Sequence, residues 1–283
     1  MRVGIGLPNA VPGSGGALLL EWVRQAEAGP FTSLGTLDRL RYDSYEPLAA
    51  LAAAAAITTR LRLATTIVIA PLRNTALLAQ TAATVDALSG GRLVLGLAVG
   101  AREDDYTTAG VPYHSRGQRL AEQLSALRDH WEGGVIGPRA GRRGGPELLL
   151  GGLSDQTFAR VARYADGYVH NGGPPRAFAR AAEKLRAAWS DAGRPGRPLL
   201  WGQGYFALGT GTAEAGAAYL REYYAFTGPF AEKIAAGLLT TPQAVAQYVR
   251  GYAEAGCDEL MLLPTIPDLA QVAALAEVLA SLG

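Results

Sequence analysis

The sequence predicts an α/β protein of the (β/α)8 class, a TIM barrel. Short apolar segments typical of buried strands alternate with segments of helical period along the whole chain. Eight such strands fit into 283 residues, a normal length for one barrel. The composition, 49% hydrophobic and 18% charged, supplies a large core. Because no linker or shift in composition divides the chain, we expect a single domain over residues 1–283.

One segment shows the repeating unit most clearly. Residues 61–70 are almost continuously apolar and β-branched, as a strand buried on both faces should be, and Pro71 ends the run. Asn74 offers an N-cap to a helix that ends at a Gly-Gly turn, and residues 93–99 form the next strand. Two buried strands joined by one helix predict a parallel pair with a right-handed crossover.

The remaining elements follow from the same patterns. The other predicted strands cover residues 2–7, 31–37, 147–150, 166–170, 199–208 and 258–263. The other predicted helices cover 18–28, 46–58, 116–132, 155–164, 176–192 and 268–282, with two or three more between 213 and 255, broken at Gly228-Pro229 and Thr241-Pro242. An extended loop region separates strands four and five. It contains a polar segment, 101–115, and a Gly/Arg-rich connection, 133–146, expected to be the most mobile part of the chain.

Charge and composition exclude several classes of function. With 26 basic and 25 acidic residues the net charge is +1, which gives no electrostatic reason to expect nucleic acid or an anionic membrane as partner. No apolar run reaches the roughly 18 residues of a membrane span. Cys257 is the only cysteine and the N-terminal apolar run is too short for a signal peptide, so we expect a cytoplasmic protein. The three histidines lack metal-ligand spacing, so no metal is expected.

Residues 64–100 resemble the bacterial luciferase-like monooxygenase superfamily; their sequence is ATTIVIAPLRNTALLAQTAATVDALSGGRLVLGLAVG. The apolar strand ending in Pro71, the LSGGR turn and the LxLG strand carry the resemblance. Further motifs occur in the same order as in the family over most of the chain. They are an Asp-Arg pair after strand two, GVPYHSRGQRLAE, GGLS, ADG and GCDELMLLP. The resemblance implies a barrel that binds FMN or the deazaflavin coenzyme F-420 at its C-terminal mouth. It also implies redox chemistry on a small organic molecule, and often a homodimer.

Two glycine-rich loops follow predicted strands five and six. Backbone N–H groups, a serine hydroxyl and the helix dipole at the first loop form an anion site, although an ordinary N-cap and turn would look the same. Glycine allows close approach of a phosphate. The resemblance implies that both loops hold the cofactor phosphate, through Gly151, Gly152, Leu153, Ser154, Gly172 and Gly173.

Thr65, Thr66 and Ile67 lie at the end of strand three. The resemblance implies a bulge here against the flavin ring, with a non-proline peptide bond, often cis, at or next to Thr66–Ile67. The alternative is that two threonines simply lie on a buried strand.

Three residues are candidates for catalysis. Asp38 follows strand two, where the resemblance implies contact with cofactor or substrate; its neighbour is Arg39, which stays protonated and would attract an anionic ligand rather than carry a proton. A surface Asp-Arg pair is the alternative. Glu103 is a candidate general acid on what otherwise is a solvated acidic loop. His170 ends strand six, where it would bond the cofactor or transfer a proton near neutral pH.

Two positions bear on the cofactor. By resemblance, FMN-binding members carry Arg where this chain has Val99, and certain deazaflavin enzymes carry Glu where it has Ala101. The missing arginine favours F-420 slightly. FMN would imply oxygen-dependent monooxygenation supplied by a separate flavin reductase, and F-420 would imply hydride transfer. Two alternatives remain: a barrel that binds cofactor without turnover, and a cofactor-free lyase or isomerase that uses the phosphate loop.

Overall fold

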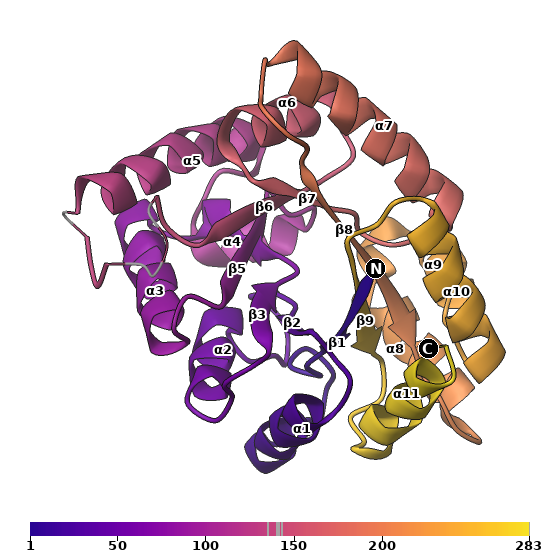
Figure 1. The fold of residues 1–283 in the computed structure, drawn as a ribbon. Coiled ribbons are helices and arrows are strands. Elements are labelled where there is room, and N and C mark those ends of the chain that lie inside the picture. Colours follow the sequence, from indigo (N-terminus) through magenta and orange to yellow (C-terminus); the bar gives the residue numbers. More distant parts are fainter. Residues whose placement is uncertain (135, 140–141, 143, 283) are drawn as a thin grey trace.

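The computed structural model describes residues 1–134, 136–139, 142 and 144–282. Its strands are all parallel and lie in the order β3-β2-β1-β9-β8-β7-β6-β5-β4, and a further pairing of β3 with β5 closes the sheet into the barrel of Figure 1. β3 and β4 are two parts of one interrupted strand, so the barrel has the eight strand positions that were predicted. The bounds are β1 Arg2–Gly6, β2 Ser33–Thr36, β3 Arg62–Thr65, β4 Val68–Ile69, β5 Leu93–Ala98, β6 Glu147–Gly151, β7 Gly167–Val169, β8 Leu199–Phe206 and β9 Glu259–Pro264.

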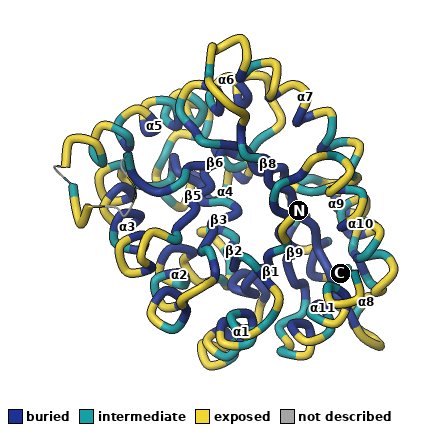
Figure 2. Tube along the Cα trace, viewed as in Figure 1, coloured by how far each residue is buried: buried dark blue, intermediate teal, exposed yellow. Residues whose placement is uncertain are grey.

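Most of the helices form an outer layer around this ring of buried strands (Figures 1 and 2). Their bounds are α1 Gly16–Ala28, α2 Pro47–Ala55, α3 Thr75–Leu88, α4 Glu103–Ala109, α5 Arg116–Gly133, α6 Asp155–Tyr164, α7 Pro175–Asp191, α8 Thr212–Tyr223, α9 Phe230–Ala236, α10 Pro242–Glu254 and α11 Ala270–Ala280. Short 3-10 segments cover Ala70–Leu72, Tyr113–Ser115 and Ala225–Thr227. The expected extra helices after the seventh strand are α8, α9 and α10. Among the described residues, none of the helices combines the length and apolar character needed to cross a membrane.

Three expectations about local structure need correction. The segment 101–115 is not a solvated loop: it contains α4, and Asp105 and Tyr106 on that helix are buried. The strand predicted over 61–70 is broken into β3 and β4. α2 ends at Ala55, three residues before the predicted Thr58. The connection 133–146 contains residues 135, 140, 141 and 143, so the expectation of mobility there lies partly outside the described residues.

The turn after α3, which carries much of the family resemblance, connects α3 to the segment before β3 through hydrogen bonds. Gly90 and Gly91 have φ of 70° and 85°, a region that favours glycine. Arg92 follows them, and its guanidinium donates to Thr58 O at 2.7 Å and to Leu61 O at 2.5 Å. These bonds tie the end of α3 to the segment that leads into β3, at the end of the barrel away from the mouth.

Met261 of β9 lies in a buried cluster with residues of β3, β5, β6, β7 and β8. A Cβ at Gly4 or Gly35 would lie 2.9 Å or less from the side chain of Met261, so the two glycines leave room for that residue. Below it, the fully buried Glu259 pairs with Arg62 at 3.1 Å and with Arg2 at 3.2 Å. These ion pairs close the N-terminal end, and the chemistry of a parallel barrel is expected at the opposite, C-terminal end.

Candidate functional site

The strand formed by β3 and β4 bulges at the mouth of the barrel. Ala64 pairs with Val94 and Val68 pairs with Leu97 on the neighbouring β5. Four steps along β3 and β4 (68 − 64) therefore lie opposite three steps along β5 (97 − 94). One extra residue in one strand is the definition of a β-bulge, a feature that directs backbone or side chains toward a site.

Side-chain hydrogen bonds take the place of the ladder at this bulge. The Thr65 hydroxyl donates to Gly96 O at 2.8 Å and accepts from Gly96 N at 2.9 Å. The amide of Thr66 donates to Thr36 O at 2.8 Å. The peptide bond between Thr66 and Ile67 is cis, at the position that the resemblance implied. A Cβ at position 96 would lie 2.1 Å from Thr65 O, so the neighbouring strand needs a glycine there.

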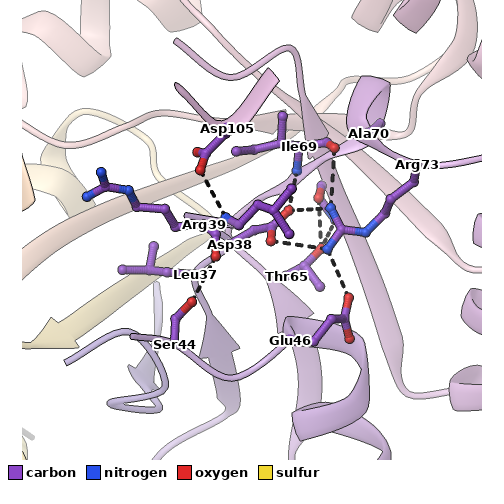
Figure 3. Close-up of polar contacts among 12 residues, drawn as sticks. Leu37, Asp38, Arg39, Ser44, Glu46, Thr65, Ile69, Ala70, Arg73 and Asp105 are labelled. Atoms are coloured by element: carbon purple, nitrogen blue, oxygen red, sulfur yellow. Dashed lines mark hydrogen bonds and ion pairs between the residues drawn. The ribbon is translucent and has the colours of Figure 1, made fainter. Parts of the chain in front are cut away.

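The Asp38 carboxylate holds the strand beyond the bulge (Figure 3). It accepts from Ile69 N at 2.7 Å and receives both ends of the Arg73 guanidinium, at 2.6 and 3.1 Å. Arg73 also donates to Glu46 at 2.9 Å. Burial raises the pKa of Asp38 above its ordinary value, against the opposing effects of Arg73 and the Ile69 N–H. Asp38 therefore lies beside the mouth, with both carboxylate oxygens bonded to protein donors.

The first glycine loop lies directly beside the bulge. A Cβ at Gly151 would be 3.5 Å from Cγ2 of Ile67, an ordinary contact. Gly152 has φ of 137°, a conformation that side chains disfavour. Leu153 is 58% exposed, and the Ser154 hydroxyl accepts from Thr157 N at 3.2 Å as the N-cap of α6. The predicted N-cap is present, and the loop before it follows a strand end, as an anion loop would.

The second glycine loop is held by two tyrosines of α10. Gly172 and Gly173 have φ of 92° and 96°, and a Cβ at Gly173 would meet no atom within 4 Å. The hydroxyls of Tyr248 and Tyr252 donate to Gly173 O at 2.9 and 3.0 Å. The two tyrosine hydroxyls thus hold the Gly173 carbonyl, while a Cβ at Gly173 would point into open space.

The glycines of β8 explain how those tyrosines reach the loop. A Cβ at Gly202 would lie 2.3 Å from the Tyr252 ring, and a Cβ at Gly204 would lie 2.7 Å from the Tyr248 ring. Without side chains, β8 lets α10 pack closely enough for both hydroxyls to bond Gly173. Gly202 and Gly204 therefore serve the close packing of α10 on β8.

His170 is buried in an aromatic setting just after β7. It is 3% exposed, and its ring packs edge-on against Tyr168 and Phe178, with centroids 6.1 and 5.8 Å away. Its Nδ1 is buried without a hydrogen-bond partner. Burial lowers the pKa of His170 to about 4, so the imidazole is neutral at pH 7. It is suited to a hydrogen bond with a ligand rather than to proton transfer near neutral pH.

The acidic residues after β5 separate into different environments. Glu103, the candidate general acid, is exposed at the start of α4. Asp104 lies 3.4 Å from Arg39, and the buried Asp105 accepts from the amides of Leu40 and Arg41 at 3.1 and 2.7 Å. The structure thus brings Asp105 rather than Glu103 to the loop after β2, where it shapes the backbone around Asp38.

Sequence reasoning missed an aromatic cluster over the mouth. Tyr219, Tyr223 and Tyr224 of α8 and its end pack with Tyr205 of β8, and the hydroxyls of Tyr205 and Tyr224 lie 2.7 Å apart. Tyr42 contacts the Tyr223 ring edge-on at 5.4 Å. The spacing of four between two tyrosines of one predicted helix was the available signal. The cluster forms an apolar wall at the mouth, in which Tyr205, Tyr219 and Tyr223 are 9%, 7% and 3% exposed.

Other reactive groups lie outside this site. Burial raises the pKa of the Cys257 thiol to about 12, so it is not a nucleophile at neutral pH. Among the described residues, no three His, Cys, Asp or Glu side chains gather in a way that could hold a metal ion.

A family model identifies the chain's relatives. The model of the luciferase-like monooxygenase family matches residues 1–256. The chain belongs to this family. This luciferase-like chain is 32% identical over 155 residues to an uncharacterised protein of Mycobacterium tuberculosis, a match that covers 50% of the chain and 54% of that relative. The chain thus spans about half the length of that curated relative.

Two solved structures share the fold of this luciferase-like chain. The monooxygenase RslO1 from Streptomyces bottropensis superposes with a TM-score of 0.78 at 20% identity, covering 99% of both chains. An F-420-dependent secondary alcohol dehydrogenase superposes with a TM-score of 0.79 at 18% identity, covering 100% of both. At these identities the likeness concerns the fold.

The Thr65 hydroxyl leads to a first prediction. Thr65→Val keeps the side-chain shape but leaves the buried N–H and C=O of Gly96 without their bonds, which should lower the free energy of unfolding by about 2–4 kcal/mol. The matched control is Thr84→Val on α3, where the hydroxyl bonds only the Gln80 carbonyl of its own helix, and we expect a change below about 0.5 kcal/mol. Urea unfolding measures both; equal effects of the two variants would contradict the role of Thr65.

The buried imidazole predicts a pH effect on stability. His170 titrates near 4 when folded and near 6.5 when unfolded, so the unfolded chain binds more protons in this window and stability falls as the pH falls. Between pH 7 and pH 5 this loss is about 2 kcal/mol. We expect His170→Gln to remove it, and His114→Gln, at an exposed position, to retain it. Urea unfolding at both pH values tests this, and an unchanged pH dependence in His170→Gln would disprove it.

Proposed function

We propose that this chain is a flavin- or deazaflavin-dependent oxidoreductase acting on a small organic molecule. The observation that carries the proposal is that the glycine loop lies beside the bulge: a Cβ added at Gly151 would be 3.5 Å from Cγ2 of Ile67. This arrangement juxtaposes a surface for a planar ring and a loop for a phosphate at the C-terminal end of one barrel. Membership of the luciferase-like monooxygenase family supports the same reaction class.

The residues present fit such a cofactor. Gly152 and Gly173 offer backbone close to a phosphate, with the N-terminus of α6 supplying N–H groups and a favourable dipole. α7 begins at Pro175 after its N-cap Pro174; neither proline has an N–H, and this helix contributes its dipole. The unpartnered Nδ1 of His170 is a buried polar atom that a ligand would satisfy. When bound, the cofactor supplies the redox chemistry, while the protein orients it and excludes water.

The three expected catalytic residues then take different parts. His170 would contact the ligand through a neutral imidazole. Asp38 is a positioning residue, because it holds Ile69 and so the strand that carries the bulge. Glu103 is exposed on α4 and would act as a general acid only on a substrate that reaches that edge of the mouth.

The choice of cofactor follows from Val99, which stands where FMN-binding relatives carry Arg. We therefore favour F-420, and with it hydride transfer, over FMN and oxygen chemistry. The structural neighbours include both a monooxygenase and an F-420-dependent dehydrogenase, so the fold accommodates either reaction. If FMN is the cofactor, a separate flavin reductase would be needed as partner.

Titration of the apoprotein with F-420 and, separately, with FMN tests the proposal through quenching of cofactor fluorescence. We expect saturable one-to-one binding of F-420 and at least about tenfold weaker binding of FMN. Tighter binding of FMN than of F-420 would still support an oxidoreductase, but one that uses oxygen chemistry. Binding of neither would contradict the proposal and favour a cofactor-free barrel.

We further propose a cytoplasmic homodimer. The outward faces of α2 and α3 carry no charged residue: Ala49 and Ala53 are exposed on α2, and Leu77 and Leu88 are 64% and 62% exposed on α3. A second copy could cover this uncharged face without desolvating charges. The molar mass in solution decides between one copy and two.

A further inference from the structure

Two arginine side chains are buried at the mouth and have no part in the cofactor site described above. Arg39 follows β2, and its side chain is 12% exposed. Arg102 precedes α4 and is 8% exposed. The Nε atom of each guanidinium is buried without a hydrogen-bond partner. Both guanidinium groups lie against one ring, that of Tyr223, at 5.6 and 4.3 Å from its centroid.

The neighbours of Arg102 are aromatic rings and a carbonyl rather than an acid. Its guanidinium lies 4.4 Å from the centroid of Phe226, and Nη2 donates to Tyr223 O at 2.9 Å. Within the described part of the chain, no carboxylate forms an ion pair with it. Arg39 has one such partner, Asp104, at the long distance of 3.4 Å.

Three other acids near the mouth are already bonded elsewhere, and Glu103 is exposed to solvent. Asp38 pairs with Arg73, Asp105 accepts two backbone amides, and Glu222 accepts from the Tyr42 hydroxyl at 3.3 Å. Arg102 is thus a buried cation without an anion. Because burying an unpaired charge is costly, an anionic group next to it would be strongly favoured.

We propose that Arg102, with Arg39 beside it, binds an anionic group of a small organic ligand at the mouth. Guanidinium groups form paired hydrogen bonds with carboxylate and phosphate oxygens, and the free Nε of Arg102 is one such donor. The aromatic rings beside it provide the apolar wall. The inference rests on the proposed function and deepens it: the substrate is a carboxylate. If the cofactor phosphate binds at Arg102 instead, the anion site stands but the two glycine loops do not hold that phosphate.

Calorimetric titration of the protein with benzoate and with benzamide tests the first source. The two probes have nearly the same shape and differ in charge. We expect wild type to bind benzoate about tenfold more tightly than benzamide, and Arg102→Met to lose this preference while binding benzamide as before. The matched control is Arg163→Met on α6, which removes an exposed guanidinium stacked on Tyr164 at 5.1 Å and should behave as wild type.

Titration with FMN and with riboflavin, which lacks the phosphate, tests the second source. A loss of about tenfold for FMN alone in Arg102→Met would place the cofactor phosphate at this arginine. Either selective loss supports the anion site. A purely structural arginine would weaken charged and neutral probes equally, and that result, or the absence of any preference in wild type, would overturn the inference.

The benzoate titration needs no cofactor, so the two proposals fail separately. If the protein binds neither FMN nor F-420 but keeps an Arg102-dependent preference for benzoate, the proposed oxidoreductase fails and the anion site remains. If the cofactor binds and no anion preference exists, the anion site fails alone.

Discussion

The bulge between β3 and β4 is the constraint on which the rest of the mouth depends. An extra residue in one strand of a closed barrel leaves backbone groups of the neighbouring strand without partners, and these are buried. The Thr65 hydroxyl satisfies both groups of Gly96, and the Asp38 carboxylate takes the amide of Ile69 just beyond. The side chains of Thr65 and Asp38 thus replace the backbone hydrogen bonds that the bulge removes, and Ile67 lies at the mouth.

Several neighbouring features serve this arrangement. Arg73 neutralises the buried Asp38, and the loop at Gly151 lies beside Ile67. On the opposite side, the glycines of β8 admit the tyrosines of α10, which fix Gly173. The candidate cofactor site therefore depends on residues spread over six strands. Most of these residues are either glycines that permit close packing or side chains that form hydrogen bonds.

The fold was largely predictable because its signals are local. Eight apolar strands alternating with helices, a cap at Asn74 and a Gly-Gly turn depend on neighbours in sequence, and the structure confirms them. The place of the bulge came from resemblance alone. What sequence reasoning missed depends on distant partners. Asp105 of α4 accepts from amides 64 and 65 residues away, and Arg102 donates to the carbonyl of Tyr223, which is 121 residues away. Helical spacing and charge patterns carry no information on such pairs.

Hydrogen exchange of backbone amides, with and without F-420 or FMN, tests the central claim that the bulge and the two glycine loops form one cofactor site. We expect bound cofactor to slow exchange in segments 65–69, 151–154 and 171–174 together, and to leave the turn at 89–92, at the other end of the barrel, unchanged. Protection confined to one of these segments, or centred on the outer helices, would contradict the claim.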